Sequence, residues 1–222
     1  MLAYVKRLTE LYEANRNEEN AGPMSKYMKN HFPFLGIKKP TRAELERQFF
    51  KETGVLKEPF NHEFIWELWN RDEREYQYTA LTYIEKSLHK LTKNDMELME
   101  RQIRTKSWWD TVDVISPKPV GTIAQKFPEV INETINGWAT HDYLWLRRAA
   151  ILFQLKFKEK TNEDLLYEYV RENAASREFF IQKAIGWALR EFSKTNPASV
   201  KEFISETKLS PLSVREGSKY LG

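Results

Sequence analysis

The chain has 222 residues, of which 41% are hydrophobic and 30% charged, and this balance excludes a disordered polypeptide. It contains no cysteine, which excludes a disulfide scaffold and thiol catalysis, and no run of about 18 apolar residues, which excludes a membrane-spanning helix. The net charge is only +3, and the surplus lies in residues 141–222, where 14 Lys and Arg stand against 11 Asp and Glu.

These bulk properties set two expectations. Because cysteine is absent and residues 1–20 hold no signal-peptide core, we expect a cytoplasmic protein. The basic surplus favours a one-sided basic surface in the C-terminal part, although so small an excess is also common in proteins with no charged partner.

Helix-start signals recur along the chain. Thr41 and Glu44 form a capping box that predicts a helix with Thr41 as its N-cap. Weaker starts follow at residues 107–110 and 161–164, and Asn196 precedes a proline that suits the first helical position. No long run alternates apolar and polar residues, so strands are not expected. The pattern predicts helices of about 10–18 residues joined by short loops.

Two segments repeat a similar pattern at an offset of 35 residues: Leu146–Ile151 and Ile181–Gly186. Each has an apolar residue, two polar ones, and then small and apolar ones. A period near 35 is typical of two-helix repeats that stack side by side. We therefore predict one domain over residues 1–222, built as a right-handed stack of antiparallel helix pairs with no sheet.

The same offset links four residues that would form a row across one face of the stack. These are Tyr78, Asp113, Arg148 and Lys183. The row is polar and mixed in sign, so it does not belong to a core. One alternative stays open, because Asp113 and Arg148 would be neighbours and could form a simple ion pair between helices.

Trp109 and Asp113 are four residues apart, which places them on one face of a helix. Tryptophan is costly to expose and a carboxylate is costly to bury without a partner. Their shared face therefore indicates a cleft where an aromatic wall meets a negative charge, and Trp187 could supply a second wall. The alternative is that Trp108 and Trp187 are core residues, which is the better assignment for Trp108.

Other chemistries find no support in the sequence. The four histidines lack metal-ligand spacing, so no metal site is predicted. No dinucleotide-binding glycine motif, P-loop or GxSxG motif is present, so nucleotide-dependent and serine-hydrolase mechanisms are not expected.

Several motifs together resemble the AlkD family of DNA glycosylases, in order and over nearly the whole chain. They are YMKNHF at 27–32, FLGI at 34–37, KSWWDTVD at 106–113, WLRRAAI at 145–151 and FFIQKAIGWALRE at 179–191. The resemblance implies a HEAT-like repeat fold: an all-α solenoid with a concave basic face that binds duplex DNA. It also implies a monomer that removes N3- and N7-alkylated purines without metal or organic cofactor.

The resemblance implies a role for each of four residues in one cleft. Asp113 matches the catalytic carboxylate of the family. Trp109 and Trp187 match the aromatic pair that flanks the sugar of the damaged nucleotide. Tyr27 matches a ring that lines the same cleft.

It also assigns contacts to DNA. Arg148 matches an arginine that contacts the DNA backbone, and Lys183 and Arg190 are predicted as further contacts from position and charge. Lys38 stands where a glutamine is expected in relatives, a departure that bears on DNA affinity and leaves the cleft untouched.

The sequence thus predicts a monofunctional alkylpurine glycosylase. The alternative is a non-catalytic module of the same fold that binds distorted or branched DNA, and the presence of Asp113 favours the enzyme. A helical scaffold for other proteins is a third reading, but it would not need Trp109, Asp113 and Trp187 around one cleft.

Overall fold

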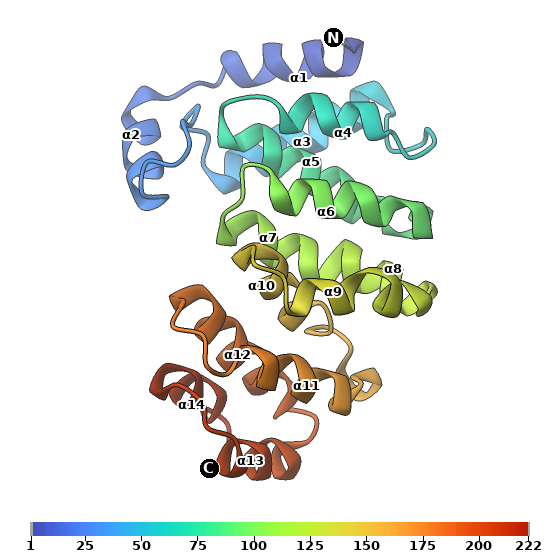
Figure 1. Ribbon diagram of the computed structural model, residues 1–222. Helices are drawn as coiled ribbons and strands as arrows, with labels where there is room; N and C mark the ends of the chain where they lie inside the picture. Colours follow the sequence, from blue (N-terminus) through green and yellow to red (C-terminus); the bar gives the residue numbers. More distant parts are fainter. Residues whose placement is uncertain (1, 222) are drawn as a thin grey trace. The chain divides into compact units, whose positions relative to one another are not determined.

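The computed structural model describes residues 2–221, and every regular element in that range is helical (Figure 1). No strand occurs among these residues, which confirms the all-α prediction. None of their helices is both long and apolar enough to cross a membrane. Backbone contacts group the chain into two compact units, Met1–Lys90 and Leu91–Gly222. The single domain over residues 1–222 stays a prediction.

The first unit contains five α-helices and a short 3-10 turn. They are α1 (Ala3–Glu13), α2 (Glu18–Tyr27), α3 (Lys39–Thr53), α4 (His62–Trp69), α5 (Arg74–Lys86) and η1 (Leu88–Lys90).

The buried carboxylate of Glu75, on α5, holds the connection between α2 and α3. Its two oxygens accept hydrogen bonds from the backbone N–H groups of Leu35, Gly36 and Ile37, each at 3.0 Å. Burial raises the pKa of Glu75, and these hydrogen bonds oppose the rise. A connection without regular structure is thereby fixed from within the unit.

The second unit contains the remaining helices. They are η2 (Lys93–Asp95), α6 (Met96–Arg104), α7 (Trp109–Ile115), η3 (Ser116–Val120), α8 (Gly121–Lys126), η4 (Ile131–Ile135), α9 (Asn136–Ala139), α10 (Leu144–Leu152), η5 (Lys158–Lys160), α11 (Glu163–Asn173), α12 (Phe179–Phe192), α13 (Pro197–Glu206) and α14 (Pro211–Gly217).

Helices of the second unit stack in two rows. In one row α7 contacts α10, α10 contacts α12, and α12 contacts α14. In the other, α9 and α11 contact each other, and each also contacts the helix that follows it in the chain (Figure 1). The core between the rows includes Leu152, Val170, Ile181, Ile185 and Leu189.

The predicted 35-residue register is reproduced by the helix starts. Helices α7, α10 and α12 begin at Trp109, Leu144 and Phe179, at intervals of 35 residues. Asp113, Arg148 and Lys183 are consequently the fifth residues of three helices that contact one another in turn. Tyr78 is likewise the fifth residue of α5, in the first unit.

Helix boundaries agree only in part with the prediction. Asn162 and Asn196 cap α11 and α13 as expected, each accepting a backbone hydrogen bond. The prediction of Thr41 as an N-cap was wrong, because the N-cap of α3 is Lys38, three residues earlier, and Pro40 lies in the first turn. The predicted minimum length was also wrong, since several helices of the second unit are shorter than ten residues.

One cause of the short helices is a wider turn inside a continuous helical stretch. The segment η3 joins α7 to α8 as a π-helical turn and contains Pro117 and Pro119. Proline lacks the N–H that an α-helical ladder needs, so the ladder is interrupted where the prolines occur.

Two glycines of the first unit test how backbone conformation and close approach contribute to stability. Gly36 has φ of 84°, and a Cβ there would lie 1.9 Å from the carbonyl oxygen of Asn17. Gly54 has φ of 65°, and nothing lies within 4 Å of its Cβ position. Gly36→Ala should therefore lower the free energy of unfolding by at least about 3 kcal/mol, and Gly54→Ala by about 1 kcal/mol, in urea titrations. Equal losses would show that the close approach at Gly36 relaxes without cost.

Candidate active site

Four helices of the second unit line an open cavity of about 400 Å³. They are α7, α10, α12 and α14, and the residues that line the cavity are Trp109, Asp113, Arg148, Phe179, Phe180, Lys183, Trp187, Arg190 and Glu216. The structure therefore brings together six of the residues predicted from the sequence, Asp113, Trp109, Trp187, Arg148, Lys183 and Arg190.

A bidentate ion pair joins Asp113 to Arg148 across neighbouring helices. The Arg148 Nε donates to Asp113 Oδ1 at 2.7 Å, and its Nη2 donates to Oδ2 at 2.9 Å. The Nη1 donates to the backbone carbonyl of Phe180. The arginine side chain is 5% exposed and the aspartate side chain 17% exposed, so only the carboxylate opens appreciably toward the cavity.

This geometry bears on the predicted role of Arg148. Its guanidinium is buried and engaged by Asp113 and Phe180, so the ion pair between helices that the sequence left open is present. The contact of Arg148 with the DNA backbone stays a prediction. The arginine holds the carboxylate in a fixed orientation.

Two opposing effects set the pKa of Asp113. Burial raises it above the ordinary value, while the hydrogen bonds and positive charge of Arg148 lower it, and the charge of nearby Asp110 raises it slightly further. Because the guanidinium keeps its charge and donates two hydrogen bonds to the carboxylate, it favours the ionised form of Asp113 against burial. The cavity thus presents a partly desolvated carboxylate with its charge retained.

An aromatic cluster beneath the ion pair was missed by sequence reasoning. Phe180 lies 5.1 Å from Trp108 and 5.0 Å from Trp145 between ring centroids, and the two tryptophans are 5.5 Å apart. Trp145 and Phe180 are each the second residue of their helices. The 35-residue register could therefore have predicted that these two rings lie side by side. Trp108, assigned to the core, is only partly buried.

Trp109 and Trp187 line the cavity from different helices and both are partly exposed. Trp187 also packs against the hydrophobic core of the second unit, so its ring is anchored on one side. The two indoles are therefore aromatic walls of the cavity that holds Asp113, as the sequence predicted.

A second charged group lies on the same cavity and centres on Glu216, which the sequence did not single out. Lys183 Nζ lies 3.3 Å from Glu216 Oε1, Arg190 Nη1 lies 3.0 Å from Oε2, and Lys219 Nζ lies 2.7 Å from Oε2. Hydrogen bonding with Lys219 and the charge of Lys183 lower the pKa of Glu216 to about 2, against a smaller effect of burial. Glu216 is therefore ionised at any pH near neutrality.

Gly186 allows this carboxylate to reach its partners. It lies between Lys183 and Arg190 along α12, and a Cβ at this position would lie 2.5 Å from the Cβ of Glu216. Only glycine admits so close an approach of α14.

Two predicted residues lie in the first unit. Tyr27 is the last residue of α2 and is 70% exposed, and Lys38 is the exposed N-cap residue of α3. Their contacts with DNA stay predictions.

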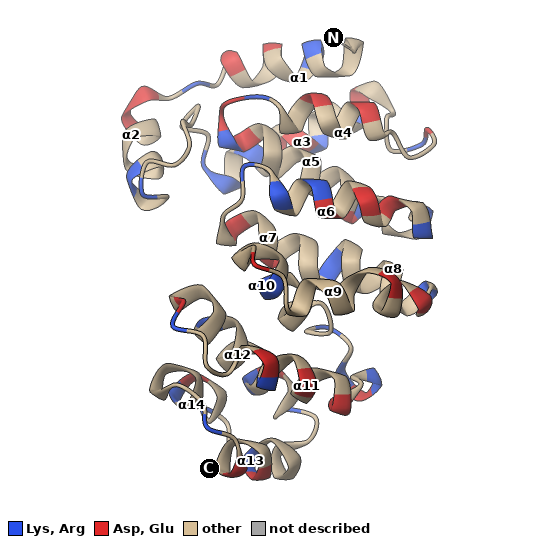
Figure 2. Ribbon diagram, in the orientation of Figure 1, with Lys and Arg blue, Asp and Glu red and all other residues tan. Residues whose placement is uncertain are grey.

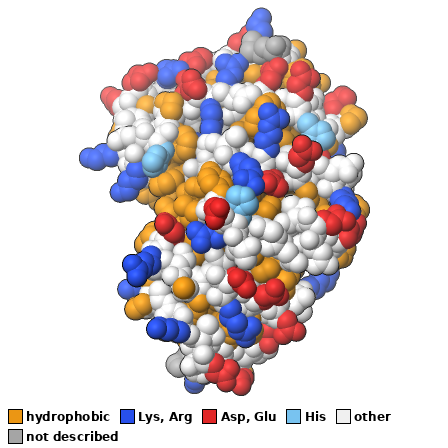
Figure 3. All heavy atoms as spheres, in the orientation of Figure 1, with side chains coloured by type: hydrophobic (Ala, Val, Ile, Leu, Met, Phe, Trp, Pro, Cys, Tyr) orange, Lys and Arg blue, Asp and Glu red, His pale blue; other side chains and the backbone are white. Residues whose placement is uncertain are grey.

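The concave basic face also stays a prediction. Lys and Arg are interspersed with Asp and Glu along the helices (Figure 2), and on the face drawn in Figure 3 neither sign forms a continuous patch. Within residues 2–221, no group of three or more His, Cys, Asp or Glu is placed to hold a metal ion.

The ion pair makes a prediction about stability and pH. Arg148→Met leaves the partly buried Asp113 without its partner, so the free energy of unfolding near pH 7 should fall by about 3 kcal/mol. The pKa of Asp113 in the folded protein then rises further above its unfolded value. Stability relative to wild type should therefore recover as the pH is lowered below neutrality and the carboxylate takes up a proton. Urea titrations at several pH values measure this.

The double variant Arg148→Met with Asp113→Asn supplies the control. It removes both charges, so most of the lost stability near pH 7 should return. A single variant that is as stable as wild type, or a loss that is independent of pH, would show that the pair does not control the charge of Asp113.

Comparisons with known proteins agree with one another. The sequence profile of a family described as DNA alkylation repair enzyme matches residues 8–221. A solved structure from Enterococcus faecalis, described as a predicted DNA alkylation repair enzyme, is 37% identical and superimposes with a TM-score of 0.83 over 93% of this chain and 97% of that chain. No curated protein sequence matches. The chain belongs to the family of DNA alkylation repair enzymes.

Proposed function

We propose that this protein is a monofunctional DNA glycosylase that hydrolyses the N-glycosidic bond of N3- and N7-alkylated purines in duplex DNA. The observation that carries the proposal is the Asp113 carboxylate, held by Arg148 in a cavity that Trp109 and Trp187 also line. Membership of the family supports a role in DNA repair.

The charge of the lesion explains why one carboxylate is enough. A purine alkylated at N3 or N7 carries a positive charge and leaves as a neutral base, so no acid is needed to protonate it. Glycoside hydrolases that expel a poor leaving group use a second carboxyl group as general acid. Here the other carboxylate on the cavity, Glu216, has its pKa lowered to about 2 and cannot donate a proton near neutral pH.

The reaction moves positive charge from the base to the sugar. As the bond between C1′ and the purine nitrogen breaks, its electron pair goes to the purine, and positive charge develops over C1′ and O4′ of the deoxyribose. The fixed Asp113 carboxylate stabilises that charge and orients a water molecule toward C1′. The electron-rich faces of Trp109 and Trp187 attract the same cation. Addition of water to C1′ and loss of its proton complete the hydrolysis.

The alternative function is a non-catalytic module that binds distorted or branched DNA. It could dispense with the Asp113 carboxylate on a cavity that Trp109 and Trp187 also line, because that carboxylate offers no donor to a phosphate. The Asp113–Arg148 pair therefore favours the enzyme.

Incubation with duplex DNA containing N7-methylguanine tests the proposal. The wild-type protein should release the free base under single-turnover conditions. Asp113→Asn keeps the shape of the side chain but removes its charge, and it should slow release by about 100-fold or more. Its affinity for the duplex should be unchanged or higher, because repulsion of phosphate is removed.

Two results would contradict the proposal. A wild-type protein that binds the duplex but releases no base would favour the binding module. A folded Asp113→Asn variant with full activity would remove Asp113 from the reaction, and a urea titration shows whether the variant is folded.

The absence of a strand-cleavage step can be tested separately. Lys183 lines the cavity, and its Nζ is paired with Glu216 Oε1 at 3.3 Å, so it is not proposed as a nucleophile. Treatment with borohydride during turnover should therefore trap no covalent complex between protein and DNA. A trapped complex that disappears in Lys183→Met would identify a Schiff-base mechanism instead.

A further inference from the structure

The cluster around Glu216 carries a net positive charge, whereas each of its ion pairs taken singly is neutral. Three cations, Lys183, Arg190 and Lys219, share one carboxylate, so two positive charges remain uncompensated. The three side chains are 38%, 24% and 46% exposed, whereas the Glu216 side chain is 10% exposed. A buried anion therefore gathers three cations that remain accessible to a ligand.

The cations also keep donors for a ligand. The ion pairs with Glu216 engage only one nitrogen of the Arg190 guanidinium and one donor of each ammonium group. Arginine has five N–H donors and lysine three, so most remain available. A phosphodiester carries one negative charge and several acceptor oxygens, and it suits such an array.

The backbone fixes the array in place. Lys183, Gly186 and Arg190 follow one another at intervals of three and four residues, so they share a face of α12. Gly186 admits Glu216 between the two cations. A second contact also joins the two helices, because Ser213 Oγ donates to the backbone carbonyl of Gln182 at 2.9 Å. The carboxylate is therefore held by α14 and not by its ion pairs alone.

We infer that Glu216 is a positioning residue that assembles Lys183, Arg190 and Lys219 into a subsite for one DNA phosphodiester beside the Asp113 cavity. Without the carboxylate, three like charges would lie close together and repel one another. With it, the cations converge where a phosphate adjoining the damaged nucleotide would lie. This inference rests on the proposed function for the identity of the ligand as DNA.

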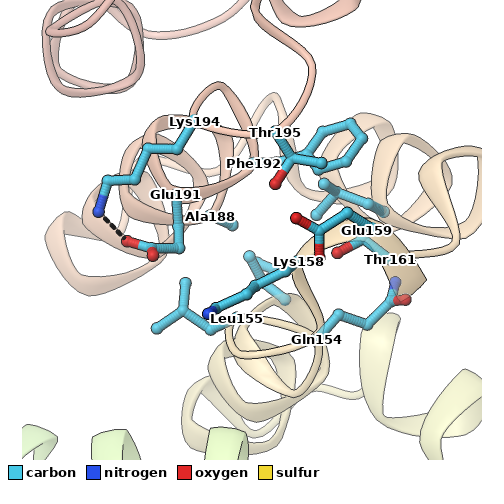
Figure 4. A pocket seen from close by; sticks show the side chains of 12 residues that line it. Gln154, Leu155, Lys158, Glu159, Thr161, Ala188, Glu191, Phe192, Lys194 and Thr195 are labelled. Atoms are coloured by element: carbon cyan, nitrogen blue, oxygen red, sulfur yellow. Dashed lines mark hydrogen bonds and ion pairs between the residues drawn. The ribbon is translucent and has the colours of Figure 1, made fainter.

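A matched control separates positioning from charge. Glu191 forms an ion pair with Lys194 at 2.7 Å, three residues apart, as Glu216 does with Lys219. This pair lies on a different cavity of about 170 Å³, lined from another face of α12 (Figure 4). Glu191→Gln and Glu216→Gln therefore remove the same charge from the same unit, and only the second touches the proposed subsite.

The test uses duplexes that carry a tetrahydrofuran abasic analogue and one neutral methylphosphonate, moved stepwise along the backbone. The wild-type protein should bind about tenfold more weakly when the methylphosphonate occupies one position near the analogue. The charge-assisted hydrogen bonds to that phosphate are lost there. Glu191→Gln should keep this dependence. Glu216→Gln should lose it, even though its overall affinity for undamaged duplex is equal or higher because a negative charge has been removed.

A catalytic readout accompanies the scan. In single-turnover release of N7-methylguanine, Glu216→Gln should lower the rate constant at saturating protein by about tenfold, and Glu191→Gln should leave it unchanged. A wild type that releases no base would contradict the proposed function, while the methylphosphonate scan would still decide the subsite. If wild type releases base and the two glutamine variants behave alike in both assays, the subsite alone is wrong.

Two further measurements complete the test. If Glu216→Gln does not fold, Lys219→Met replaces it, because Lys219 is largely exposed; unchanged dependence at the sensitive position would then overturn the inference. Inorganic phosphate added at constant ionic strength should weaken binding of the analogue duplex by wild type more than by Glu216→Gln, because it occupies the same cations. Equal effects on the two proteins would overturn the subsite.

Discussion

The pairing of Asp113 with Arg148 is the interaction on which the rest of the site depends. A carboxylate that is largely removed from water loses its charge or finds a partner, and here the partly buried Asp113 is paired with an arginine that is buried. Arg148 is in turn held by the carbonyl of Phe180, whose ring packs on Trp108 and Trp145. An aromatic cluster, a guanidinium and a carboxylate thus form one connected structure. Its end facing the cavity is a negative charge of fixed orientation, which is what stabilisation of a sugar cation requires.

The helical repeat explains how such a structure can be assembled from distant parts of the sequence. Helices that start at intervals of 35 residues and pack in sequence bring equivalent positions side by side. The fifth position supplies Asp113, Arg148 and Lys183, and the second position supplies Trp145 and Phe180. The last helix departs from the register, and its carboxylate, Glu216, reaches the row through the space left by Gly186. The cavity therefore combines a neutral ion pair with a cluster of positive net charge.

Much of this arrangement could be predicted from the sequence, because periodic patterns and local spacings carry it. The all-helical class, the register and the shared cavity of Trp109, Asp113 and Trp187 belong to that part. The sequence left open whether Arg148 pairs with Asp113 or contacts DNA. Spacing shows that two residues are neighbours, but it does not show which of them faces the ligand. Glu216 was missed because its position is decided by tight packing at one glycine, and such packing leaves no periodic signal. The start of α3 differed because a proline in the first turn competed with the capping box at Thr41.

The central claim is that the fixed charge of Asp113 stabilises positive charge on the sugar. The most direct measurement compares binding of two duplexes that differ at one nucleotide: one carries a neutral tetrahydrofuran ring, and the other a pyrrolidine ring that is protonated at the position corresponding to C1′. The wild-type protein should bind the cationic duplex at least about tenfold more tightly near pH 7, and Asp113→Asn should bind the two duplexes equally. Equal binding by the wild type, or a preference that survives in Asp113→Asn, would contradict the account.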